Sequence, residues 1–194
     1  MFDWLKRHRQ PSQASQLYGA VVAQARQPRF FAEFGVPDTL EGRYEMIVVH
    51  LHALTERLQQ EGEAGQALAR DVLEIFVAEM DDSLREVGVG DMAVPRRIKR
   101  AAAGIYDRFG DYSAGLRETE GSLPAALALH IFGIADGTTE STSLEVQHGC
   151  QALATYMRRM AEHISKQPAS RIMTGKIDFG RVDEEADNDP RTPT

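Results

Sequence analysis

Glu145 and His148 stand three residues apart in a segment with helical spacing, so a carboxylate and an imidazole would share one helix face. Di-iron bundles use this spacing, but they need two such pairs and two further glutamates. The sequence holds no second copy, and Glu145 also fits the last position of a capping box that begins at Thr142. A carboxylate–histidine metalloenzyme is therefore the weakest function that we consider, and no metal site is predicted.

Three other side chains have types that could take part in chemistry. His50 and His52 are about 200° apart around a helix of 3.6 residues per turn, so a regular helix cannot offer both to one metal ion. We expect one at the edge of the core and the other in solvent. Cys150 could pair with His148 or His130 as nucleophile and base, but nothing specifies an oxyanion hole or an orienting third group. We therefore interpret Cys150 as a small core residue.

Residues 88–93 read Gly-Val-Gly-Asp-Met-Ala and match the relaxed dinucleotide-binding fingerprint Gly-x-Gly-x-x-Ala. That fingerprint needs a buried strand before it and a helix after it, whereas the residues before it follow an amphipathic helical pattern. A linker between two helices is the better interpretation. The sequence also lacks a nucleophile elbow, a phosphate-binding loop and a paired-cysteine zinc motif, so we predict no catalytic residues, no cofactor and no enzyme activity.

The net charge is -7, but the charges are segregated along the chain. Residues 183–194 hold five acidic residues and one arginine, whereas residues 95–117 hold six basic and two acidic residues. Four of those cations crowd the start of a predicted helix, where the partial positive charge of the helix N-terminus disfavours them. They are Arg96, Arg97, Lys99 and Arg100. We interpret this basic cluster, together with Arg108, as a basic face that attracts an anionic partner.

The first residues form a short amphipathic segment. Phe2, Trp4 and Leu5 could insert at a membrane interface while Lys6 and Arg7 meet lipid phosphates. The segment is too short to bind strongly alone, and a frayed, solvated terminus is the alternative interpretation. The sequence has no run of about 18 apolar residues and no apolar secretion signal. We expect a cytoplasmic protein that can contact the cytoplasmic face of the inner membrane peripherally.

The elements that position these residues are predicted to be helices. Apolar residues recur at three-and-four spacing in six stripes, and no segment alternates as a strand does. The stripes run through residues 17–25, 40–58, 68–87, 98–116, 127–132 and 144–164. With 194 residues, 42% of them hydrophobic, the chain can bury one core without disulfides. We predict an all-α fold of six to seven helices, in which the long amphipathic helices pack antiparallel.

The predicted organisation has three parts. An amphipathic, basic segment at 1–14 precedes the helical domain at 15–167. An extended, largely disordered acidic tail follows at 168–194. Within that tail, Ile172, Ile177 and Phe179 are apolar residues that could pack an extended segment against the body.

Two stretches of the sequence resemble a known family. They are residues 34–46, Phe-Gly-Val-Pro-Asp-Thr-Leu-Glu-Gly-Arg-Tyr-Glu-Met, and residues 87–99, Val-Gly-Val-Gly-Asp-Met-Ala-Val-Pro-Arg-Arg-Ile-Lys. Both are similar to motifs of the ubiquinol–cytochrome c chaperone family. This family includes the mitochondrial assembly factors for the cytochrome bc1 complex and their alphaproteobacterial relatives. The resemblance runs from about Tyr18 to at least Leu116.

The resemblance implies an all-helical, cofactor-free chaperone that binds newly made cytochrome b, or an early assembly intermediate, during biogenesis of the bc1 complex. The mitochondrial relatives act with a small partner protein and near the ribosomal exit tunnel. Because this chain begins without a transit presequence, these two contacts are open here. The family offers no catalytic residues to carry over, so the two motifs and the basic cluster supply the candidates for client or partner binding. They are Asp38, Arg43, Tyr44, Glu45, Asp91, Arg96, Arg97, Lys99 and Arg100.

The alternative to an assembly chaperone is a helical adaptor that binds anionic lipid or nucleic acid through the basic face. Such binding depends on phosphate contacts and weakens steeply as the salt concentration rises. The negative net charge argues against a specific nucleic-acid partner.

Overall fold

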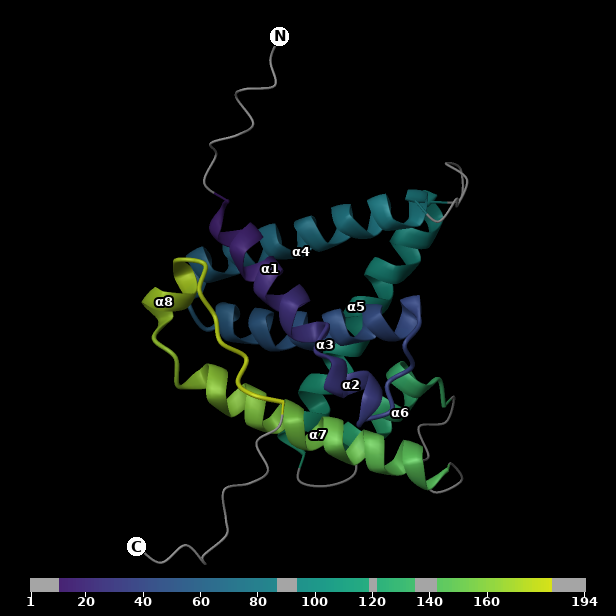
Figure 1. The fold of residues 1–194 in the computed structure, drawn as a ribbon. Helices are drawn as coiled ribbons and strands as arrows, with labels where there is room; N and C mark the ends of the chain where they lie inside the picture. Colours follow the sequence, from purple (N-terminus) through teal and green to yellow (C-terminus); the bar gives the residue numbers. More distant parts are fainter. Residues whose placement is uncertain (1–10, 87–93, 119–121, 135–142, 183–194) are drawn as a thin grey trace, which may run out of the picture.

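The structure of the chain, a computed structural model, describes residues 11–86, 94–118, 122–134 and 143–182. It describes their side chains except at residues 81, 83–86 and 94–103. Every regular element in these ranges is an α-helix, which confirms the predicted fold class (Figure 1). The helices are α1 (Gln13–Ala25), α2 (Pro28–Ala32), α3 (Leu40–Gln59), α4 (Gly62–Glu86), α5 (Val94–Arg117), α6 (Ser122–Phe132), α7 (Leu144–Ser165) and α8 (Ala169–Met173).

Short polar and proline signals set several helix starts. The Thr39 hydroxyl caps α3 by accepting a hydrogen bond from the Gly42 amide at 3.1 Å. Ser143, one residue later than the predicted cap, accepts from the amide of Val146 at the start of α7. Pro28 separates α1 from α2 and stands in the first turn of α2, where its missing amide hydrogen removes no helical bond.

Helix α3 runs through the centre of the fold. It packs against α1, α4, α5, α6 and α7, and its buried residues surround the helix axis instead of forming one stripe. Helix α4 follows α3 after residues 60–61 and returns antiparallel to it, as predicted (Figure 1). Side chains of α3 that a one-sided stripe would leave in solvent are therefore inside the protein.

Both histidines of α3 illustrate this central position. The prediction that one of them faces solvent is wrong, because His50 and His52 are both buried. His50 Nδ1 donates to the Met46 carbonyl at 2.7 Å, so Nε2 accepts from the Tyr156 hydroxyl of α7, also at 2.7 Å. His52 Nε2 lies 2.8 Å from Ser113 Oγ of α5. Burial lowers the pKa of each imidazole to about 4, so both are neutral at pH 7.

The chain after α7 is partly helical, since α8 forms at the start of the segment expected to be extended. Ile172 and Phe179 are buried, and the Phe179 ring lies edge-on to the His50 ring at a centroid distance of 5.3 Å. The Gln167 side chain holds this segment by donating to the Asp178 carbonyl and accepting from the Asp178 amide. The acidic residues 183–194 lie outside the described residues.

Candidate functional site

Two candidate residues at the start of α3 lie on the surface. Asp38 and Arg43 are exposed and form an ion pair with a distance of 2.7 Å between Arg43 Nε and Asp38 Oδ1. The hydrogen bond from Arg43 holds the pKa of the Asp38 carboxyl below its usual value. Exposed pairs of this kind contribute little to folding, so both side chains are available to exchange partners. Leu40 between them is 54% exposed, which adds an apolar contact to the same surface.

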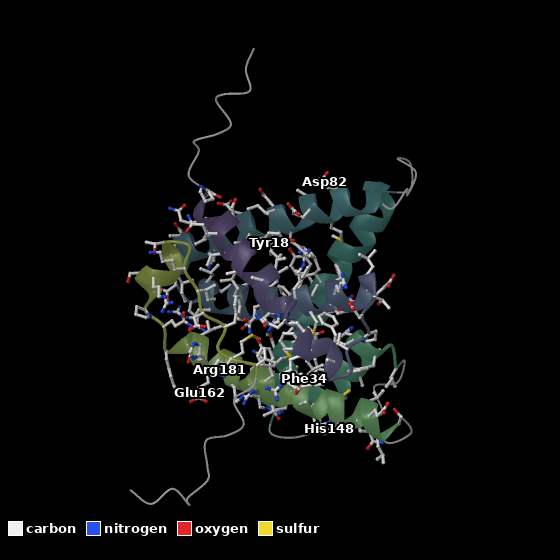
Figure 2. All side chains as sticks on the ribbon, viewed as in Figure 1. Tyr18, Phe34, Asp82, His148, Glu162 and Arg181 are labelled. Atoms are coloured by element: carbon white, nitrogen blue, oxygen red, sulfur yellow. The ribbon has the colours of Figure 1, made fainter. Side chains whose placement is uncertain are left out.

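Two glycines fix the loop that leads into this surface. A Cβ at Gly42 would lie 2.0 Å from the Pro37 carbonyl oxygen, and a Cβ at Gly149 of α7 would lie 2.3 Å from the Phe34 carbonyl oxygen. Neither distance is compatible with a side chain unless the backbone moves. Phe34 thus lies directly over α7 (Figure 2). These two close approaches hold residues 34–42 against α3 and α7 and place Asp38 outward.

Glu45, a third candidate, lies inside the protein. It is 5% exposed, and both carboxylate oxygens accept hydrogen bonds from Arg108 of α5, at 2.7 Å from Nε and 2.6 Å from Nη2. Arg108 Nη1 also donates to the Gly104 carbonyl at 3.0 Å. Burial raises the pKa of the Glu45 carboxyl, although the Arg108 guanidinium acts against this shift. Glu45 therefore links α3 to α5 through Arg108, and its carboxylate is not at the surface.

The same pair changes the interpretation of Arg108 and Tyr44. Arg108 was grouped with the basic face, but its charge is compensated by Glu45. Its guanidinium carbon lies 5.9 Å from the centroid of the Tyr44 ring. Tyr44 is half-buried, and its ring also contacts the ring of Phe76 on α4 at a centroid distance of 5.8 Å. Both residues thus support the packing of α3, α4 and α5.

The four cations of the basic cluster all lie in the first two turns of α5, as predicted, although the structure does not describe their side chains. Helix α5 begins on the side of the molecule where α3 begins and α4 ends (Figure 1). The start of α3 and the basic cluster are therefore at the same end of the fold. Other candidates lie outside the described residues, namely Asp91, Phe2, Trp4, Leu5, Lys6 and Arg7.

The described residues give the metalloenzyme and nucleophile interpretations no support. Glu145 and His148 are both exposed, and His148 lies on the outer side of α7 (Figure 2). No group of three or more His, Cys, Asp or Glu side chains within the described ranges could hold a metal ion. Cys150 is buried in the core, as predicted, and burial raises the pKa of its thiol to about 11. The thiolate that a nucleophile requires is therefore scarce at pH 7.

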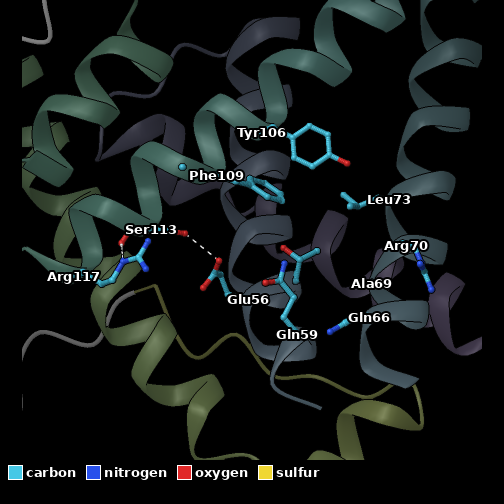
Figure 3. Close-up of a pocket in the computed structure, with 12 residues that line it drawn as sticks. Glu56, Gln59, Gln66, Ala69, Arg70, Leu73, Tyr106, Phe109, Ser113 and Arg117 are labelled. Atoms are coloured by element: carbon cyan, nitrogen blue, oxygen red, sulfur yellow. Dashed lines mark hydrogen bonds between the residues drawn. The ribbon is translucent and has the colours of Figure 1, made fainter. Parts of the chain in front are cut away.

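Two further features come from the fold. No helix in the described part of the chain is long and apolar enough to cross a membrane. Helices α4 and α5 diverge from the side where α4 ends and α5 begins (Figure 1). A groove of about 550 Å³ lies between them with α3 as its floor (Figure 3). Tyr106 and Arg117 of α5 line this groove opposite Arg70 of α4. No local sequence motif marks these residues, because they become neighbours only when the helices pack.

Comparisons with known proteins point to one family. Residues 32–179 match the family described as ubiquinol-cytochrome C chaperone. Curated relatives include the ubiquinol-cytochrome c reductase complex assembly factor 1 of Mus musculus, which is 20% identical over 165 residues, covering 84% of this chain and 53% of that protein. The Homo sapiens protein of the same name is 20% identical over 167 residues, covering 86% and 53%. The chain thus spans about half the length of these relatives.

A solved structure extends the comparison to the fold. The crystal structure of the Cbp3 homolog from Brucella abortus matches with a TM-score of 0.76 and 34% sequence identity. The match covers 89% of this chain and 91% of that one. The helical arrangement described above is therefore shared over nearly the whole of both chains.

Proposed function

Because the chain belongs to the ubiquinol-cytochrome c chaperone family, we propose that it is an assembly factor for the ubiquinol–cytochrome c reductase (bc1) complex. The family match over residues 32–179 carries this proposal. The family is one of chaperones and not of enzymes. The function to explain is therefore recognition of another protein, and the relevant features of this chain are its surfaces.

We propose that the client is newly made cytochrome b or an early assembly intermediate, and that it binds the α3–α5 end. This name denotes the exposed residues Asp38, Leu40 and Arg43 together with the basic cluster of α5. The exposed ion pair and the neighbouring leucine support the proposal, because they combine exchangeable charge with an apolar contact. The cations support it because a helix N-terminus is an unfavourable place for them unless an anionic group is bound.

A client that is a membrane protein requires its assembly factor to work near the bilayer. We propose that the N-terminal segment provides a weak peripheral contact, with Phe2, Trp4 and Leu5 at the interface and Lys6 and Arg7 near lipid phosphates. One short amphipathic segment gives only reversible attachment. Contacts with the client would therefore supply most of the affinity that holds this chain at the membrane.

Deletion of the gene from its host tests the proposed function. We expect the reduced-minus-oxidised absorbance of cytochrome b and the ubiquinol–cytochrome c reductase activity of the membranes to fall together. A plasmid copy of the gene should restore both, and the activity of another respiratory complex serves as the control. Normal bc1 spectra and activity in the deletion strain would refute the proposal.

A further inference from the structure

Helices α4 and α5 form the two walls of the groove, each with residues from one side of the helix. The α5 lining consists of Tyr106, Phe109, Gly110, Ser113 and Arg117, and the α4 lining consists of Gln66, Ala69, Arg70 and Leu73. Both sets follow the three-and-four spacing that defines one side of a helix. Helix α3 closes the bottom of the groove with Thr55, Glu56 and Gln59. The groove therefore has the walls and floor that a further helix would need for packing.

The lining is divided into an apolar and a polar end. Leu73, Tyr106 and Phe109 gather at one end, while Gln59 and Gln66 lie toward the other (Figure 3). Tyr106 is 71% exposed, although it is a large aromatic side chain. Tyrosine and arginine are enriched among the residues that dominate protein–protein binding energies. This composition is typical of a protein interface.

The charges of the groove favour an acidic occupant. Arg70 and Arg117 stand on opposite walls (Figure 3), and neither forms an ion pair with a carboxylate of the described residues. Arg117 Nε donates to the Ser113 carbonyl at 3.0 Å, which holds the guanidinium along the α5 wall. The one acidic residue in the lining, Glu56, accepts a hydrogen bond from the Ser113 hydroxyl, with 3.1 Å between the two oxygens. The lining thus carries a surplus of positive charge.

The hydrogen bonds around Ser113 keep Glu56 at the floor. Because a carboxylate only accepts, Ser113 Oγ donates to Glu56, and His52 Nε2 must then donate to Ser113 Oγ across 2.8 Å. This direction also excludes His52 as a base that activates the serine. The chain His52–Ser113–Glu56 is therefore a positioning network, and it leaves the two arginines to meet an incoming anion.

We propose that this groove binds an acidic amphipathic helix of a partner protein. An apolar residue of that helix would sit among Leu73, Tyr106 and Phe109, and its carboxylates would pair with Arg70 and Arg117. Tyr106 and Arg117 are eleven residues apart on α5, which is about 17 Å along the axis, so the bound helix has about three turns. This inference rests on the proposed function, because it assigns a second protein contact to the assembly factor.

Gly110 gives a way to fill the groove without disturbing the fold. A Cβ at Gly110 would meet no atom within 4 Å, and the same is true of the exposed Gly19 on α1. We therefore expect Gly110→Trp to block the groove, and Gly19→Trp, outside the groove lining, is the matched control. Circular dichroism of both variants checks that their helicity equals that of the wild type.

The probe is a fluorescein-labelled, 16-residue synthetic helix with a leucine stripe and glutamates on both flanks, measured by anisotropy against the full chain. We expect a lysine-flanked version to bind about fivefold to tenfold more weakly. Gly110→Trp should weaken binding of the glutamate peptide about tenfold, and Gly19→Trp should leave it unchanged. Equal affinity for the two peptides, no binding, or unchanged binding by Gly110→Trp would each overturn the proposal.

The two proposals can fail separately. If deletion of the gene removes the bc1 complex but the groove binds no acidic helix, the assembly role stands and the groove assignment is wrong. If the bc1 complex is normal after deletion but Gly110→Trp abolishes peptide binding, the groove binds a helix from a protein outside that assembly pathway. The second result would refute the proposed function and leave the docking surface in place.

Discussion

Glu45 of α3 and Arg108 of α5 are joined inside the protein by two hydrogen bonds of 2.7 and 2.6 Å. Arg108 divides α5 into two parts with different proposed roles. The basic cluster lies toward the N-terminus, whereas most of the α5 groove lining lies on the C-terminal side. One partly buried ion pair therefore sets the position of both proposed binding surfaces relative to the central helix.

Replacement of one partner of this pair should destabilise the fold. Arg108→Met leaves Glu45 buried without a compensating charge, which we expect to lower the free energy of unfolding by about 3 kcal/mol. The double variant Glu45→Met/Arg108→Met removes both charges and should recover most of that loss. Urea denaturation of Arg108→Met, Glu45→Met and the double variant checks this. If the double variant is as unstable as the sum of the single variants, the pair is not coupled as described.

The helices of this protein follow from local signals, whereas the position of α3 does not. Thr39 and Pro28 mark helix starts within a few residues of sequence. The burial of His50 and His52 depends instead on five neighbouring helices, most of them distant in sequence. A one-sided apolar stripe predicts one buried face, so the stripe of α3 underestimates how much of that helix is enclosed.

The candidate site, like the fold, was predictable only where a local signal marks the residue. The exposure of Asp38 and Arg43 agrees with their place at a polar helix start. Glu45 and Arg108 are 63 residues apart, and neither has a local feature that marks it as half of a buried pair. Charged residues are expected at the surface because they are rarely buried unless paired. Glu45 and Arg108 were therefore both assigned to binding surfaces. Only tertiary packing reveals such a pair.

The close approach at Gly42 should make that position intolerant of any side chain. Gly42→Ala places a methyl group 2.0 Å from the Pro37 carbonyl oxygen, so we expect a loss of about 2 kcal/mol or more in unfolding free energy. Gly110→Ala is the matched control in another helix, and its Cβ meets open space. Because alanine is the better helix former, Gly110→Ala should be neutral or stabilising by up to about 1 kcal/mol. Equal stability of the two variants would contradict the proposed packing at Pro37.

The buried imidazoles should make stability fall in acid. His52 has a pKa of about 4 in the folded protein and 6.5 as its ordinary value. Between these pH values the unfolded chain holds a proton that the folded protein lacks, so unfolding becomes easier as the pH falls. Each such histidine contributes up to about 1.4 kcal/mol per pH unit within that window and nothing above it. Glu45 acts in the opposite sense, because burial raises the pKa of its carboxyl.

A variant isolates the contribution of His52. His52→Phe removes that imidazole and leaves Glu45 unchanged, so the difference in unfolding free energy from wild type cancels the carboxyl contribution. We expect this difference to be constant above pH 7 and to shift in favour of the variant by about 1.4 kcal/mol per pH unit between pH 6 and 5. His148→Gln, at an exposed position, is the control. Parallel pH profiles for His52→Phe and wild type would rule out a neutral, buried His52.

Charge reversal of the basic cluster should separate binding from folding. Glutamates suit a helix N-terminus better than cations do, so replacing Arg96, Arg97, Lys99 and Arg100 by Glu should keep the helicity and the melting temperature of the chain. We expect co-purification of cytochrome b with the tagged variant to fall at least about tenfold. The double variant Arg96→Glu/Arg97→Glu reverses two charges of the cluster and allows a matched control. That control is Arg171→Glu/Lys176→Glu, which reverses two exposed cations elsewhere and should retain the client. Undiminished cytochrome b in the cluster variants would remove the start of α5 from client binding.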